Sequence, residues 1–127
     1  MADENTRIFI VDSSEIWRRI LTQQILNVPG IEIAGEAESG QAAIFMLEEA
    51  NPDVIIMEAS EDNSMPVSDA IKQLHSVKPG VRIILSVDSA RKDFVVKAAG
   101  DEDIDFITKP FKQQIVLRTI NESANET

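Results

Sequence analysis

Cysteine and tyrosine are absent from this sequence of 127 residues, and histidine and tryptophan occur once each. Without cysteine there are no disulfides, no thiol catalysis and no cysteine-based zinc sites, which fits a reducing compartment. Basic residues are also scarce, because 12 Lys and Arg face 22 Asp and Glu and leave a net charge of -10. Affinity for phosphate backbones comes from clustered Lys and Arg, so we expect no direct nucleic-acid binding.

Long hydrophobic runs are missing as well. No apolar stretch approaches the roughly 20 residues that cross a membrane, and the acidic start lacks the layout of a secretory signal. We therefore expect a cytoplasmic protein that does not bind membranes. A composition of 43% hydrophobic and 27% charged residues is globular, and the length predicts one domain over residues 1–127, with a core at about 6–123.

Short apolar runs alternate with segments of helical spacing along the whole chain. The predicted strands are 7–11, 31–35, 53–57, 81–85 and 104–108, and the predicted helices are about 15–28, 39–50, 67–77, 90–99 and 112–123. In the first helix, Ile16, Trp17 and Leu21 are expected to face inward with the other apolar residues. This alternation predicts an α/β fold with a doubly wound parallel sheet and right-handed crossovers.

The first and third strands are the most uniformly apolar, which places them at the centre of the sheet. The predicted architecture is a flavodoxin-like (βα)5 three-layer sandwich with strand order 2-1-3-4-5. Asp12, Glu58 and Lys109 each follow or end a strand, so the carboxyl edge of the sheet brings them into one pocket. Taken singly, each could be an ordinary strand-end charge, but their joint position favours an inherited active site.

These residues resemble a known family. The segments that carry the resemblance are Val11-Asp12, Pro52 to Glu58, Leu85-Ser86 and Phe106 to Phe111. Together they resemble the receiver domain of bacterial response regulators, over essentially the whole chain. The resemblance implies a signal-transduction module of a two-component or phosphorelay system, and not an enzyme beyond residual autophosphorylation and autodephosphorylation.

The resemblance also implies roles for individual residues. In the family, an aspartate at the end of the third strand is phosphorylated by a histidine kinase, and acids after the first strand hold Mg²⁺. Glu58 then occupies the phosphoacceptor position, and the switch residues are Ser86, Phe106 and Lys109. A cation and a fixed ammonium neutralise the charge that develops during phosphoryl transfer.

The metal ligands that the resemblance implies are Asp12, Glu58 and the backbone carbonyl of Ser60. Ser13 stands where the family usually has a second acid, which weakens the Mg²⁺ site. Glu58 also departs from the pattern, because its extra methylene moves the carboxylate by roughly one C–C bond, about 1.5 Å, relative to an aspartate. Phosphoryl transfer needs both positions.

We therefore interpret the chain as an atypical receiver that acts through protein contacts without phosphorylation. Glu58 would lie within reach of Lys109 and Ser86 and would imitate a phosphoryl group in part, since it carries one charge against nearly two. Its expected partners are a histidine kinase, a downstream signalling protein or its own output domain, and a homodimer is a further expectation.

Two other functions remain open from the sequence. One is a working Mg²⁺-dependent phosphoacceptor that uses Glu58, Asp62 or Asp53, although Asp53 begins its strand at the opposite end. The other is a flavin carrier on the same fold, but no phosphate-binding loop follows the first strand. Among the remaining residues, Phe106 could be plain core, Trp17 could cover the pocket, and His75 is expected on a solvated helix face.

Overall fold

The computed structural model describes residues 5–59, 67–93, 97 and 104–125. Its five strands pair in parallel in the order β2-β1-β3-β4-β5. The strands are β1 (Thr6–Val11), β2 (Ile31–Ala37), β3 (Val54–Glu58), β4 (Arg82–Asp88) and β5 (Asp105–Lys109). The predicted flavodoxin-like topology is confirmed, and the predicted strand boundaries are within three residues of those observed.

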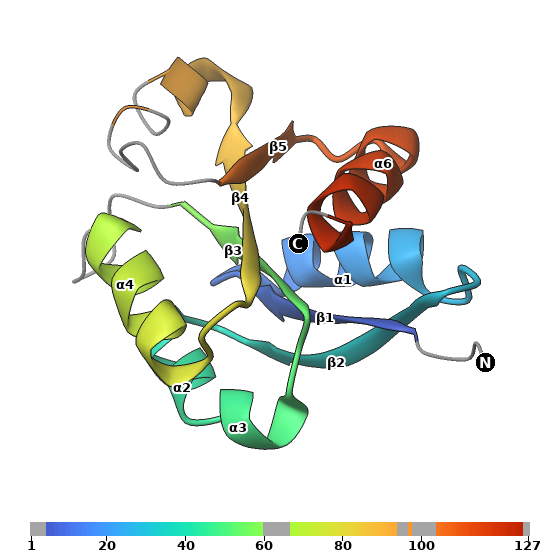
Figure 1. Ribbon diagram of the computed structural model, residues 1–127. Helices are drawn as coiled ribbons and strands as arrows, with labels where there is room; N and C mark the ends of the chain where they lie inside the picture. Colours follow the sequence, from blue (N-terminus) through green and yellow to red (C-terminus); the bar gives the residue numbers. More distant parts are fainter. Residues whose placement is uncertain (1–4, 60–66, 94–96, 98–103, 126–127) are drawn as a thin grey trace.

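Helices cover both faces of the sheet (Figure 1). One face carries α1 (Glu15–Ile25) and α6 (Gln113–Ala124), whose inward residues form one core cluster with the sheet. The other face carries α2 (Gly40–Ile44), α3 (Leu47–Ala50) and α4 (Val67–Val77), which share the second core cluster. The molecule is therefore a three-layer sandwich, as the sequence predicts.

Side chains of the central strands alternate between these two clusters. In β1, Ile8 and Ile10 pack toward α1 and α6, whereas Phe9 and Val11 pack toward the opposite layer. All four are buried, which explains why residues 8–11 are all apolar instead of alternating with polar residues. The same alternation decides on which face a side chain at the end of a strand lies.

Gly35 allows β1 and β2 to approach closely. A Cβ atom on Gly35 would lie 2.8 Å from Cε2 of Phe9, closer than two carbon atoms can approach. Phe9 is fully buried and has no room to withdraw. The register between the two strands shifts beside this contact, between Ile8 and Phe9.

Two predicted helices differ from those observed. The segment 39–50 is not one helix, because Phe45 and Met46 interrupt it between α2 and α3. The first helix ends at Ile25, and Asn27 beyond it adopts a positive φ of 65° that does not continue a helix. Ile16 was expected to face inward but is 70% exposed, because it lies on the first turn of α1 and away from the sheet.

The predicted helix at 90–99 falls partly outside the described residues. Of those described, Ser89–Arg91 form a 3-10 turn, and Lys92, Asp93 and Lys97 are helical. Within the described ranges, no helix is both long and apolar enough to cross a membrane.

Candidate functional site

The carboxyl edge of the sheet gathers four polar side chains that have apolar neighbours along their strands. Asp12 follows β1, Glu58 ends β3, Ser86 lies in β4 and Lys109 ends β5. Residues two positions earlier, such as Ile10 and Ile56, belong to the cluster under α1 and α6. Because strand side chains alternate, all four polar side chains lie on that same face.

A single ammonium group joins the two acids. Lys109 Nζ lies 3.0 Å from Asp12 Oδ2 and 3.6 Å from Glu58 Oε2. The side chains of Lys109 and Asp12 are only 8% and 4% exposed, so this pair has lost most of its hydration. The structure thus brings together the three charged residues that the sequence assigns to one pocket, with Lys109 between the carboxylates.

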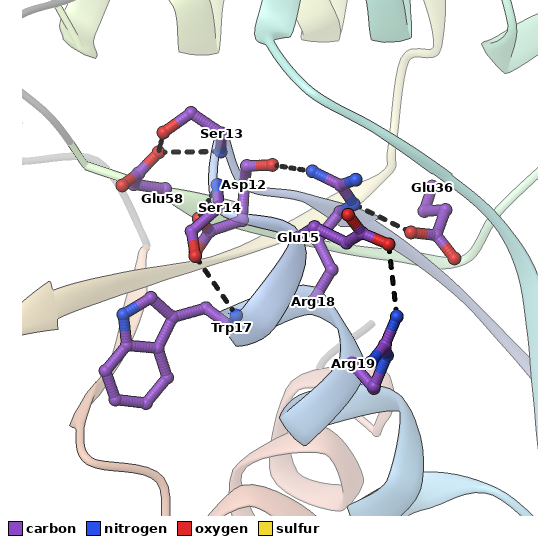
Figure 2. Close-up of polar contacts among 9 residues, drawn as sticks. All are labelled: Asp12, Ser13, Ser14, Glu15, Trp17, Arg18, Arg19, Glu36 and Glu58. Atoms are coloured by element: carbon purple, nitrogen blue, oxygen red, sulfur yellow. Dashed lines mark hydrogen bonds and ion pairs between the residues drawn. The ribbon is translucent and has the colours of Figure 1, made fainter.

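The other oxygen of Glu58 is held by Ser13. Glu58 Oε1 accepts one hydrogen bond from the Ser13 backbone N–H and one from its hydroxyl, each 3.0 Å long (Figure 2). This contact was not predicted from the sequence, which indicated Ser13 as a weakened metal position and, with Ser14, as a cap of the following helix. A hydroxyl directly after the aspartate of the first strand, opposite a longer acid on the third strand, is the signal that would have revealed it.

Further hydrogen bonds fix the loop that carries Asp12. The Ser14 backbone N–H donates to Asp12 Oδ1 over 2.8 Å, and the Ser14 hydroxyl accepts from the backbone of Trp17 as the N-cap of α1. The backbone carbonyl of Asp12 accepts a hydrogen bond from Arg18 Nη1 over 2.6 Å, and Arg18 also pairs with Glu36 (Figure 2). The start of α1 therefore holds the Asp12 loop against the sheet.

Aromatic rings cover the inner side of the pocket. Lys109 Nζ lies 5.0 Å from the centroid of the Trp17 ring, within the range of a cation–π interaction. Trp17 packs edge-on against Phe111, with ring centroids 5.4 Å apart and an interplanar angle of 78°. Trp17 therefore covers the pocket, and its partly buried side chain also packs against the core cluster under α1 and α6.

Ser86 and Phe106 are the other two switch residues that the resemblance implies. Ser86 is buried and directly opposite Glu58 in the register, but within the described residues no hydrogen bond joins its hydroxyl to Glu58. Glu58 thus contacts Lys109, whereas Ser86 lies opposite Glu58 in the register without a hydrogen bond to its carboxylate. Phe106 is half-buried against the cluster of the opposite layer. Ser60, whose carbonyl the resemblance assigns to a metal, lies outside the described residues.

Among the described residues, the pocket offers a divalent cation two carboxylates, and both already have partners. Mg²⁺ needs several oxygen atoms that are free to coordinate it. Each carboxylate oxygen of Asp12 and Glu58 instead faces an N–H, an O–H or the Lys109 ammonium. In the part of the chain that the structure describes, no group of three or more His, Cys, Asp or Glu side chains could hold a metal.

His75 differs from its expected exposed position. Its Nε2 lies 3.0 Å from the carbonyl oxygen of Val81, and the residue is half-buried. The histidine therefore connects the end of α4 to Val81, the residue before β4.

An open parallel α/β sheet with acids and a lysine at its carboxyl edge defines a receiver-like architecture, and comparison with known proteins agrees. The family model of the response regulator receiver domain matches residues 8–121. The chain belongs to the response regulator receiver domain family. It is thus a receiver domain of a two-component system, which is a signalling domain and not an enzyme.

Relatives of known function are similar over nearly the whole chain. The chemotaxis protein CheY of Bacillus subtilis is 34% identical over 122 residues, which is 94% of this chain and 98% of that protein. The chemotaxis protein CheY of Thermotoga maritima is 31% identical over 115 residues, which is 91% of this chain and 94% of that protein. The family assignment confirms the resemblance drawn from the sequence.

The fold is shared with solved structures. The response regulator domain of Thermotoga maritima CheB superposes with a TM-score of 0.76 at 25% identity, covering 98% of this chain and 99% of that chain. The signal receiver domain of a modulated diguanylate cyclase from Desulfovibrio desulfuricans has a TM-score of 0.83 at 15% identity, covering 97% and 96%. The second likeness concerns the fold alone.

Proposed function

We propose that this receiver domain acts through protein contacts without being phosphorylated, and that Glu58 is a permanent anion at the phosphoacceptor position. The observation that carries the proposal is the attachment of both Glu58 oxygens. Ser13 donates two hydrogen bonds to Oε1, and the Lys109 ammonium lies beside Oε2. Both Glu58 oxygens therefore already have partners, whereas a phosphoacceptor carboxylate needs a free oxygen to attack phosphorus.

Phosphoryl transfer would demand more than this pocket offers. A carboxylate oxygen must approach the phosphorus atom in line while a cation neutralises the developing charge. Glu58 would have to give up its bonds to Ser13 first, and its side chain is only 20% exposed. Ser13 donates protons in a position where a metal would need an acceptor, so positioning and charge neutralisation are both impaired.

The same bonds explain how Glu58 could fix a signalling state. Its negative charge attracts Lys109 at the end of β5, which also binds the buried Asp12. A phosphoryl group carries nearly two charges, so the imitation is partial, and it acts through Lys109 and Ser13 instead of Ser86. The state of the β5 edge is then set by the sequence and not by a kinase.

The partners follow from the family. The relatives from Bacillus subtilis and Thermotoga maritima are chemotaxis proteins, which supports a signalling pathway of that class in the cytoplasm. We propose a protein partner, either a kinase, a downstream protein, an output domain or a second copy of the chain. The charge of -10 argues against nucleic acid as a partner.

Phosphorylation itself tests the proposal. The protein is incubated with Mg²⁺ and a small acyl phosphate, and intact mass spectrometry measures any gain of a phosphoryl group. The parent should remain unmodified. A matched variant that restores the family pattern, Ser13→Asp with Glu58→Asp, should gain one phosphoryl group at residue 58. A phosphoryl group mapped to Glu58 in the parent contradicts the proposal, and one on Asp53 or Asp62 supports the working-phosphoacceptor alternative.

A metal titration gives an independent measure. Trp17 lies against Lys109, so its fluorescence reports on the pocket. Millimolar Mg²⁺ should leave the fluorescence of the parent unchanged and should alter that of the double aspartate variant. A saturable response of the parent would show that Asp12 and Glu58 release their partners to bind the cation.

A further inference from the structure

The opposite layer of the sandwich has an exposed aromatic residue that the proposed function does not use. Phe45 is 88% exposed at the break between α2 and α3, and the neighbouring Met46 is 40% exposed. Val77 on α4 is a further exposed apolar side chain of this layer. Leaving a phenylalanine in water forfeits the free energy of burying it, so this position calls for an explanation.

The local geometry fixes Phe45 in its outward position. Ala43 and Leu47, four residues apart, are fully buried and anchor the two short helices to the core. Phe45 lies midway between them with helix-like angles of -73° and -13°, which turns its side chain toward the other side. The backbone conformation at the break between α2 and α3 therefore directs the Phe45 side chain into solvent.

A hollow adjoins the phenylalanine. It has a volume of about 390 Å³ and is lined by Gln41, Ile44 and Phe45 from the α2 segment and by Gln73 from α4. Figure 1 shows α2 and α4 side by side on the face of the sheet away from α1 and α6. We call this hollow, together with Phe45, the α2/α4 groove. It lies on the opposite layer from the pocket of Lys109.

Exposed acids outnumber exposed bases next to the groove. On α4 the exposed charges are one acid, Asp69, and one base, Lys72, whereas the neighbouring Glu38 before α2 and Glu48 and Glu49 on α3 are all exposed acids. Glu48 and Glu49 follow Phe45 by three and four residues and lie on α3, directly after the break. With a net charge of -10, a second copy of the chain is repelled from this surface, whereas a basic segment is attracted.

We propose that the α2/α4 groove docks a basic amphipathic helix of a partner protein. An apolar side chain of that helix would fill the hollow beside Ile44 and Phe45, and Lys or Arg side chains would face Glu48 and Glu49. Helix-in-groove recognition uses this combination of an apolar anchor and flanking charges. The surface is small, so binding is transient, as in many signalling contacts. The proposal is independent of the state of Glu58.

A synthetic peptide tests the proposal on the full chain. The probe is a helical peptide with a leucine stripe flanked by lysines, and the control peptide has glutamates in place of the lysines. Amide NMR titration of the protein with the lysine peptide should shift signals at 41–49 and 73–77. Phe45→Ser should weaken binding at least about tenfold, as expected for loss of an aromatic anchor.

Matched variants separate the groove from general stickiness. Glu48→Lys with Glu49→Lys should weaken binding of the lysine peptide by a further measurable factor. Ile115→Ser removes an apolar side chain of similar size, 39% exposed on α6, and should leave binding unchanged. Because Phe45 is exposed, Phe45→Ser should keep the parent's unfolding midpoint, so a loss of binding is not a loss of fold.

Several results would overturn the proposal. These are no binding of the lysine peptide, equal binding of the glutamate peptide, or shifts centred on α6. An equal effect of Ile115→Ser would show that the contact is not specific to the groove. Sedimentation that reveals a dimer of the parent, abolished by Phe45→Ser, would identify a second copy as the occupant and contradict a basic partner.

Discussion

Replacing Lys109 by methionine tests the energetics of the charged pocket. Methionine has a similar length and no charge, so the variant keeps much of the packing against Trp17 and removes the ammonium. Asp12 then remains 4% exposed, with the Ser14 backbone N–H as the partner of Oδ1 and nothing replacing Lys109 at Oδ2. Glu58 is less affected, because Ser13 still donates to it and it is 20% exposed.

The expected loss comes mostly from Asp12. Removing one partner of a buried ion pair costs about 3–5 kcal/mol, because an uncompensated charge stays buried. The longer, partly exposed contact at 3.6 Å to Glu58 adds at most about 1 kcal/mol. We expect Lys109→Met to lower the free energy of unfolding by about 3–6 kcal/mol, a large share of the roughly 5–15 kcal/mol of a typical domain.

Urea unfolding followed by circular dichroism measures this loss. Asp12→Asn in the Lys109→Met background should recover part of it, because the buried charge is gone. The double-mutant cycle should give a coupling energy of at least about 1 kcal/mol between the two residues. A Lys109→Met variant within about 0.5 kcal/mol of the parent, or strictly additive effects of the two substitutions, would refute the reasoning.

Three smaller changes follow from other contacts. Gly35→Ala should cost about 1–3 kcal/mol in urea unfolding, because its Cβ meets the buried Phe9 at 2.8 Å, and a neutral result would contradict that contact. Ser14→Ala should cost about 1 kcal/mol by removing the N-cap of α1, whereas Ser14→Asp should retain the stability of the parent. Trp17→Leu should lower the free energy of unfolding by about 0.5–1 kcal/mol more in the parent than in the Lys109→Met variant. Equal losses in the two proteins would exclude a cation–π contribution.

Much of the fold could be predicted because the central strands β1 and β3 are mostly apolar. Such runs are typical of strands buried on both faces, and their alternation with helices leaves few topologies. The order of the strands then brings Asp12, Glu58 and Lys109 to one edge, which the structure shows through the contacts of Lys109. These features depend on periodicity and topology, which the sequence displays directly.

Other features depend on side-chain conformation and could not be predicted in the same way. Periodicity alone does not show that Ser13 turns toward Glu58, or that Ser86 has no bond to it. The break at Phe45 was also missed, because the apolar spacing of 39–50 is compatible with a continuous helix. Local hydrogen bonds and packing decide these details, and a spacing pattern carries little information about them.

The amide NMR spectrum of the parent, recorded before and after Mg²⁺ and a small acyl phosphate are added, tests the central claim most directly. Ser13 is the most informative residue, because its N–H donates to Glu58. We predict that the amide signals of Ser13, Glu58 and Ser86 stay in place, while Glu58→Gln alone, without any phosphate donor, moves the Ser13 signal. Movement of these signals in the parent on addition of the donor, with no effect of Glu58→Gln on Ser13, would contradict the account.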